Sequence, residues 1–220
     1  VRYLARRMRR IHRREFKYTG KAIQLVKRAQ LDFVLVEGME SLAPSRKEPI
    51  TYDEKIQMLR TPDGTRVKSS TIKELRWDSW CGVNYRAMML LAADAGFRKD
   101  EMTGFNALKM SRASIFWVIG GKIIRNPSAD QLLALSNNDF CGVLVAGSKN
   151  DPFGLHFSVH PIFVRFNASD EDNSARALRD LILRCPVKAE DLRSTPLFTC
   201  SANFSPFSPT LVDRLFEATC

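Results

Sequence analysis

The segment from Tyr85 to Phe105 reads YRAMMLLAADAGFRKDEMTGF, and the rest of the chain can be interpreted outward from it. Its first half is apolar from Ala87 to Ala93, which predicts a buried helix. Gly96 follows, and glycine at the end of a helix favours a left-handed turn. Arg98 comes just after this turn, where a guanidinium held by packed helices could bind two oxygens of one phosphate or carboxylate. The alternative interpretation is a helix–turn–helix corner that carries a solvated charge cluster.

The composition is that of a globular protein in a reducing compartment. The chain has 220 residues, of which 45% are hydrophobic, so it can form a substantial core. Asp94 and Arg98 interrupt the longest apolar run, and no membrane span is predicted. The five cysteines are odd in number and widely spaced, which predicts neither a zinc site nor a disulfide framework. Because the sequence begins with Val1, we expect it to be a fragment of a longer protein.

Positive charge is concentrated at the start of the chain. Residues 1–30 contain eleven Lys and Arg and one acidic residue, so they carry the whole formal net charge of +10. Such a block attracts polyanions, and nucleic acid is the natural partner. A solvated basic helix and an anionic membrane surface are the alternatives.

Residues 1–17 can form one helix with a thin apolar stripe and arginines around most of its circumference. His12 lies among these arginines without a neighbouring histidine, so it is not expected to bind a metal. The side chains expected to contact phosphates are Arg6, Arg7, Arg9, Arg10, Arg13, Arg14 and Lys17.

The remaining sequence predicts a mixture of helices and antiparallel strands. Thr51 and Glu54 form a capping-box pattern that opens a helix from Asp53 to Arg60. Ser208 and Pro209 similarly begin a final helix. The other expected elements are a helix over 21–37, a linker over 43–49, strands over 114–119 and 122–124, a short helical turn within 127–139, a hairpin of 140–148 with 155–166, and a helix over 170–184.

Two motifs resemble those of a known family. The stretch Ala95–Met102, AGFRKDEM, resembles the first arginine box of the tyrosine recombinases, the phage-integrase family. The stretch Gly147–Gly154, GSKNDPFG, resembles the family's β-hairpin with a catalytic lysine at its tip. The segment Ser194–Phe198, STPLF, and the helix after Ser208 follow in the family's order, so the resemblance covers most of the chain.

The resemblance implies an α+β protein. The expected fold is a mainly helical catalytic domain of tyrosine-recombinase type, with a small antiparallel β-hairpin sheet, over residues 50–220. The C-terminal part of an all-α core-binding domain over residues 1–42 and a linker over 43–49 would precede it.

The resemblance also implies roles in cutting and rejoining DNA by phosphoryl transfer. Arg98 would hold two non-bridging phosphate oxygens, and Glu101 would orient the turn around it. Lys149 would protonate the leaving 5′ oxygen. Neither a metal nor an organic cofactor is implied, and the expected partners are double-stranded DNA and further copies of the protein in a synaptic oligomer. The expected location is intracellular: the nucleus of a eukaryote, or the cytoplasm and nucleoid of a bacterium or phage host.

Part of the family's constellation is absent from this sequence. No tyrosine follows Tyr85, so the family's nucleophile is missing. His160 and Arg165 are separated by four residues where the family's His-x-x-Arg box has two, and they are not substituted for it. We therefore expect a C-terminally truncated recombinase that is inactive by itself.

Two other interpretations remain open. The first is a non-catalytic nucleic-acid-binding protein derived from a mobile element. The second is an unrelated α+β protein with a basic arm, such as an RNA-associated or membrane-surface scaffold. Convergence of Arg98 and Lys149 on one basic cleft would exclude the second interpretation.

Overall fold

The computed structural model describes residues 50–97, 99–104, 107, 110–144 and 161–220. The chain divides into two units, Val1–Glu48 and Pro49–Cys220, and the described residues all belong to the second. The expected helices over 1–17 and 21–37, the linker and the phosphate-binding residues from Arg6 to Lys17 lie outside the described residues.

The described part of the second unit is an α+β structure, as the sequence predicts. Its helices are α3 (Tyr52–Arg60), α4 (Trp80–Ala95), α5 (Lys99–Met102), α6 (Ala129–Leu133), α7 (Ser174–Arg184) and α8 (Pro209–Thr219), with 3₁₀ turns η3 (Arg112–Ser114) and η4 (Ala189–Asp191). Its strands are β1 (Thr65–Arg66), β2 (Glu74–Leu75), β3 (Ile115–Ile119), β4 (Lys122–Ile124), β5 (Phe140–Val143) and β6 (Ile162–Arg165).

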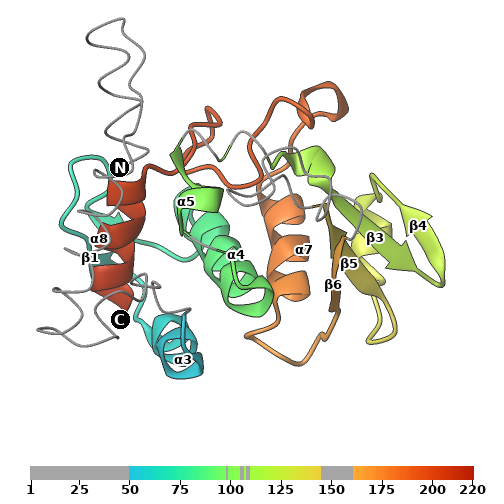
Figure 1. Cartoon of the computed structure of the whole chain (residues 1–220), viewed down its shortest axis with the longest axis horizontal. Coiled ribbons are helices and arrows are strands. Elements are labelled where there is room, and N and C mark those ends of the chain that lie inside the picture. The colour runs from blue at the N-terminus through green and yellow to red at the C-terminus, as the bar shows by residue number, and fades with distance from the viewer. Residues whose placement is uncertain (1–49, 98, 105–106, 108–109, 145–160) are drawn as a thin grey trace, which may run out of the picture. The chain divides into compact units, whose positions relative to one another are not determined.

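Helix α4 is the centre of this unit. Figure 1 shows α8, α4, α7 and the sheet β4-β3-β5-β6 following one another in layers. Residues all around the first three turns of α4 are buried, among them Tyr85, Met88 and Leu91. A helix that is apolar on every side is stable only when other elements surround it. The apolar run from Ala87 to Ala93 therefore lies in α4, the helix against which the other layers pack.

The sheet is antiparallel throughout. Its strand order is β4-β3-β5-β6, so two consecutive hairpins join through the pairing of β3 with β5. Trp117 and Cys141 are cross-strand partners and both are fully buried. On the opposite face, the ring of Phe116 lies over Gly142 and meets Phe163 edge-on, with ring centroids 5.7 Å apart.

Local capping signals place the helix ends. The Thr51 side chain accepts from the Glu54 amide, and Glu54 accepts from the Thr51 amide at 2.7 Å, so the capping box is complete. Ser208 caps α8, with Pro209 at the first position. These expectations are confirmed, as are β3, β4, the short helix α6 and the helix that ends before Pro186.

Three features differ from the sequence expectations. Helix α4 begins before Tyr85, because Ser79 accepts from the Gly82 amide and caps the helix there. The Lys- and Ser-rich connection before it contains the small sheet β1–β2. The described parts of the expected 140–148 and 155–166 strands are shorter, β5 and β6, although they pair antiparallel as a hairpin requires.

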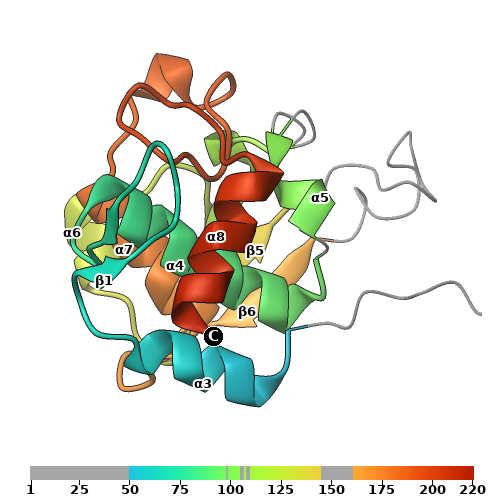
Figure 2. The same ribbon diagram turned by 90° about the vertical axis from the view of Figure 1, so that its left-hand side faces the viewer.

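Helix α8 covers the side of α4 that faces away from the sheet. Figure 2 shows α8 lying in front of α4, with α3 below them both. The buried hydroxyls of Tyr85 and Thr219 are 3.1 Å apart, which joins the two helices. Trp77 stacks on the Tyr85 ring. Because α8 closes the core on this side, α4 is held between two layers.

Candidate functional site

The corner between α4 and α5 is the first part of the candidate site. Gly96 ends α4 with φ 68° and ψ 26°, the left-handed conformation that the sequence predicts. The Phe97 amide donates to the Ala92 carbonyl at 3.1 Å and closes the last turn. The backbone that leads into Arg98 is thus set by a glycine-dependent turn.

The other side of the corner is attached to α8. Lys99 forms an ion pair with Asp213 at 2.5 Å, and Met102 is buried. The Gly104 amide donates to the Phe207 carbonyl at 2.8 Å. Glu101 lies on α5 between these contacts and is half-buried. Residues that precede and follow Arg98 are therefore both packed into the unit.

The two expected catalytic cations are not themselves placed. Arg98 and Lys149 lie outside the described residues, as does the basic segment from Arg6 to Lys17. The last described residue before Lys149 is Leu144, whose amide donates to the Ser114 carbonyl at 2.8 Å. Strands β5 and β6, which lie on either side of Lys149 in the sequence, are hydrogen-bonded neighbours.

A buried polar network connects α4 with the sheet and with the Pro-Leu-Phe segment. Asn84 is fully buried, and its Oδ1 accepts from the Arg112 Nη2 and from the Thr199 amide, both at 3.0 Å. Its Nδ2 donates to the Trp80 carbonyl at 2.8 Å. The Arg112 amide donates to the Thr195 carbonyl at 3.0 Å. One asparagine thereby fixes three segments that are distant in the sequence.

Arg112 is an unusual member of this network because it is a buried cation. Only 5% of its surface is exposed, and no carboxylate among the described residues forms an ion pair with it. Burial lowers the pKa of the guanidinium to about 10, so it remains charged at neutral pH. Its Nε–H has no hydrogen-bond partner among the described residues.

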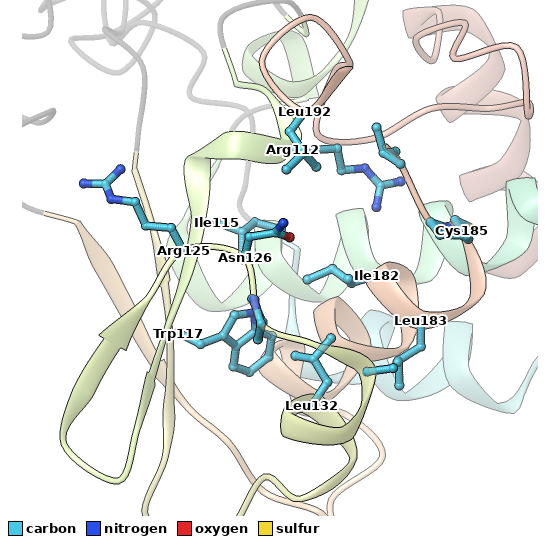
Figure 3. A pocket seen from close by; sticks show the side chains of 14 residues that line it. Arg112, Ile115, Trp117, Arg125, Asn126, Leu132, Ile182, Leu183, Cys185 and Leu192 are labelled. Carbon is cyan, nitrogen blue, oxygen red and sulfur yellow. The ribbon is translucent and has the colours of Figure 1, made fainter. Parts of the chain in front are cut away.

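A cavity of about 250 Å³ opens beside this arginine. It lies between η3, β3, α6 and the end of α7, and its walls are mostly apolar side chains such as Leu132, Ile182 and Leu192. Figure 3 shows Arg112 and Trp117 at opposite ends of it. The Trp117 indole N–H, like the Arg112 Nε–H, is buried without a partner in the described part of the chain.

The sequence did not point to this cavity. Arg112 is preceded by Ser111 and followed by Ala113 and Ser114, and an arginine in such a stretch ordinarily indicates a solvated turn. Trp117 lies in the strand that the sequence predicts over 114–119. The two residues share only their position beside or within the β-rich run 114–119. That position does not predict that their N–H groups lack hydrogen-bond partners among the described residues.

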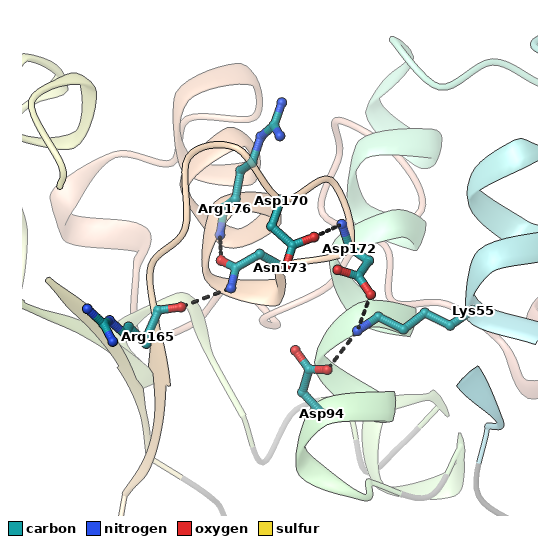
Figure 4. A network of polar contacts seen from close by, with 7 residues as sticks. All are labelled: Lys55, Asp94, Arg165, Asp170, Asp172, Asn173 and Arg176. Carbon is teal, nitrogen blue, oxygen red and sulfur yellow. Dashed lines mark hydrogen bonds and ion pairs between the residues drawn. The ribbon is translucent and has the colours of Figure 1, made fainter. Parts of the chain in front are cut away.

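A second polar cluster joins α3 to α4 and α7. Lys55 Nζ lies 2.9 Å from Asp94 and 3.4 Å from Asp172, as Figure 4 shows. Burial alone would lower the pKa of Lys55, but the two carboxylates outweigh it and raise that pKa. A hydrogen bond from the Asp170 carboxyl, together with Lys55, lowers the pKa of Asp172, and the same bond raises the pKa of Asp170. This cluster therefore holds α3 against α4 and against the start of α7, which is a structural role.

The described residues hold no cluster of His, Cys, Asp and Glu that could bind a metal ion. The five cysteines are free, and three of them, Cys81, Cys141 and Cys185, are buried. Burial raises the pKa of the Cys81 thiol to about 12, so it is not a thiolate nucleophile at neutral pH. Within the described ranges, none of the helices has the length and apolarity needed to cross a membrane.

Comparison with models of protein families, with curated proteins and with solved structures finds no match for this chain. The resemblance to tyrosine recombinases therefore rests on the sequence motifs.

Proposed function

We propose that this chain is part of a DNA-binding recombinase of the tyrosine type, whose complete form cuts and rejoins DNA by phosphoryl transfer. The observation that carries the proposal is the corner at Gly96. A left-handed turn precedes Arg98, and α5 is attached to α8 directly after it.

Such a corner suits the electrostatic requirement of the reaction. The transition state of phosphoryl transfer places extra charge on the phosphate oxygens, and donors that are already in position stabilise it most. A guanidinium gains this advantage when its backbone is held on both sides. Phe97 and Lys99, the neighbours of Arg98, are both half-buried.

The position of Lys149 in the chain supports its proposed role as general acid. It belongs to the connection between the antiparallel neighbours β5 and β6. A lysine on such a connection can approach a leaving 5′ oxygen while the sheet stays fixed.

A non-catalytic DNA-binding protein is the second candidate function. The observation that favours it is the location of the tyrosines. Tyr85 is fully buried against α8, and burial raises its pKa well above the ordinary value. In the family the tyrosine nucleophile follows the lysine, and here no tyrosine follows Tyr85, so the 220 residues by themselves would bind DNA without cutting it.

The test uses the full-length gene product and duplex DNA suicide substrates that trap the cleaved state. Arg98→Ala is expected to lower cleavage by about a hundredfold or more, with DNA affinity changed much less. Arg66→Ala, which removes an exposed arginine on β1, is the matched control and should leave cleavage unchanged. Cleavage by Arg98→Ala at the wild-type rate would refute the assignment.

The role of Lys149 needs a readout that separates proton transfer from structure. Lys149→Ala should cleave an ordinary substrate slowly but a substrate with sulfur in place of the 5′ bridging oxygen at nearly the wild-type rate. A thiolate leaves without protonation, so the general acid becomes unnecessary. A variant that is equally slow with both substrates would exclude the general-acid role.

A further inference from the structure

One face of the sheet β4-β3-β5-β6 presents an exposed aromatic ring. Helix α7 packs against β5 and β6 on the core face (Figure 1), where Trp117 and Cys141 are fully buried. Side chains alternate between the two faces of a strand, so Phe116 and Phe163 stand on the opposite face with Gly142 between them. Phe163 is 54% exposed although its strand is paired, which makes it a candidate contact for a partner.

The neighbouring positions extend this apolar surface across all four strands. Cross-strand pairing places one row of residues side by side: Ile123, Val118, Phe140 and Arg165. Ile123 is 68% exposed, and Val118 and Phe140 are half-buried. The Nε of the exposed Arg165 donates to the Asn137 carbonyl at 2.6 Å, which fixes this cation at the edge of the sheet. We call this row, together with Phe116 and Phe163, the outer face.

The Phe163 ring is held by a buried ring beside it. Phe116 is 6% exposed and meets Phe163 at an interplanar angle of 88°, with ring centroids 5.7 Å apart. Such an edge-to-face arrangement is favourable for two aromatic rings. A side chain that is already ordered loses less conformational entropy on binding than a free one. The exposed ring of Phe163 is therefore prepared for contact with a partner.

The charged side chains on these four strands are all positive. The strands contain Lys122 and Arg165 and no acidic residue. Arg125 follows β4 directly and is exposed, and Figure 3 shows its guanidinium directed away from the cavity. Asp139, which precedes β5, is 5% exposed and its carboxylate accepts from two backbone amides. The outer face therefore suits a partner that is negatively charged.

An aromatic surface bordered by cations matches the chemistry of a single nucleic-acid strand. Each of its nucleotides carries one phosphate and one unpaired base, and such bases stack on aromatic side chains while the phosphates approach Lys and Arg. A duplex buries the faces of its bases, and the core of a protein interface is depleted of charge. Phe140 and Phe163 are diagonal neighbours on adjacent strands, about 7–8 Å apart, so each ring can receive a base of its own.

We propose that the outer face binds unpaired nucleotides of a single nucleic-acid strand. The bases stack on Phe163 and Phe140, and the phosphates lie near Arg165 and Arg125. This inference does not rest on the proposed recombinase function, because binding a single strand requires no cleavage chemistry.

Fluorescence anisotropy of the 220-residue chain with a labelled oligodeoxyuridylate of about eight nucleotides tests this inference. Residues 1–30 are also basic, so an abasic strand of the same length and charge is the reference. The strand with bases should bind at least about twentyfold more tightly than the abasic strand. Phe163→Ala should weaken binding of the strand with bases about tenfold and leave binding of the abasic strand unchanged.

Further variants separate stacking from a general apolar contact. Phe163→Leu keeps an apolar side chain without a ring, so it should lose as much affinity as Phe163→Ala. Phe163→Trp should retain the affinity, and its added indole fluorescence should be quenched by the strand with bases but not by the abasic strand. Tyr52→Ala is the matched control, because it removes a 68% exposed aromatic ring from α3 and should change nothing. Arg165→Gln should reduce the salt slope by about 0.7.

The backbone of the probe distinguishes the two sources of unpaired bases. Oligouridylate and oligodeoxyuridylate carry the same base on ribose and on deoxyribose, so the tighter of the two identifies RNA or DNA as the partner. The dependence on the Phe163 ring is expected for that tighter strand. Thermal melting of each variant checks that it is folded.

Several results would overturn the inference. They are equal affinity for the strand with bases and the abasic strand, wild-type binding by Phe163→Ala, and full retention of affinity by Phe163→Leu. Vesicles of phosphatidylserine and the oligomeric state of the chain are measured with the same variants. If Phe163→Ala loses vesicle binding or self-association while strand binding is unchanged, the outer face belongs to a membrane contact or to a second copy instead.

Discussion

At the scale of single residues, two glycines allow close approaches that no other residue would permit. A Cβ on Gly82 would lie 2.1 Å from the Arg76 carbonyl oxygen. This oxygen also accepts from the Ser79 hydroxyl at 2.6 Å, so the cap of α4 and the Arg76 backbone are joined at this point. A Cβ on Gly142 would instead lie 2.2 Å from the ring of Phe116. One glycine is required by backbone and the other by a side chain.

We expect Gly82→Ala to lower the free energy of unfolding by about 3 kcal/mol, because the backbone of two segments must move apart. Gly142→Ala should cost about 1 kcal/mol, because the Phe116 ring can shift. Chemical denaturation of both variants measures the two values.

The double variant Gly142→Ala with Phe116→Leu provides the control. Its destabilisation should be smaller than the sum of the two single changes, since the leucine removes the ring atoms that the new methyl meets. A loss for Gly82→Ala no greater than that for Gly142→Ala would contradict this interpretation of the α4 cap.

At the scale of elements, Lys55 connects three parts of the unit. It belongs to α3, Asp94 lies near the end of α4, and Asp172 precedes α7 (Figure 4). Its side chain is 10% exposed, so removing the cation leaves two carboxylates without compensation. Nearby, Asn173 caps α7 and donates to the Arg165 carbonyl of β6 at 2.9 Å. The loop before α7 thus joins the helical layers to the sheet.

Lys55→Met is expected to lower the free energy of unfolding at pH 7 by about 3 kcal/mol. The loss should shrink as the pH falls below about 4. The folded protein lowers the pKa of Asp172, so the stability it contributes is present above its unfolded pKa and is lost as the pH falls through its folded pKa. The raised pKa of Lys55 keeps its contribution present up to alkaline pH.

Denaturation curves between acidic and alkaline pH measure this profile. The control is Arg214→Met, which breaks the exposed pair with Glu217 and should cost no more than about 0.5 kcal/mol at any pH. A loss in Lys55→Met that is equally large at pH 3 and pH 7 would show that packing, not charge, explains it.

At the scale of the whole molecule, charge is unevenly divided. Residues 1–30 carry the net charge of +10, whereas the unit Pro49–Cys220 has 21 basic and 19 acidic residues. Sequence-independent DNA affinity depends on cations that release counterions from phosphates. The proposed function therefore assigns most of the salt dependence to the first segment.

Neutralising Arg6, Arg7, Arg9 and Arg10 to glutamine is expected to flatten the salt dependence of duplex DNA binding. If all four contact phosphates, the slope of log K against log salt should fall by roughly 3 to 4. Fluorescence anisotropy at several salt concentrations gives the slope.

The matched control neutralises four exposed cations of the second unit, Arg60, Lys68, Lys122 and Arg193. It changes the net charge equally but should leave the slope nearly unchanged. Equal effects of the two quadruple variants would mean that total charge, and not the first segment, determines binding.

Features set by neighbouring residues could be predicted from the sequence. The capping box at Thr51, the left-handed Gly96 and the Ser208–Pro209 start of α8 are confirmed, because each depends on hydrogen bonds or backbone angles within a few residues. The Ser79 cap was missed, since the two tryptophans around it gave no helical period. Of the candidate site, the sequence determined the corner that leads into Arg98.

Contacts between distant faces were decided only by the tertiary structure. Three examples link residues that are far apart in the chain. Strand β3 pairs with β5, Asn84 accepts hydrogen bonds from Arg112 and Thr199, and Lys55 forms an ion pair with Asp172. The buried N–H groups of Arg112 and Trp117, which have no hydrogen-bond partner among the described residues, also result from the tertiary packing. Hydrophobic periodicity shows which face of an element is apolar, and capping residues show where a helix ends. Neither shows which other element covers the apolar face. That choice is made by the packing of α4 between α8, α7 and the sheet, and the cavity exists because the packing there is incomplete.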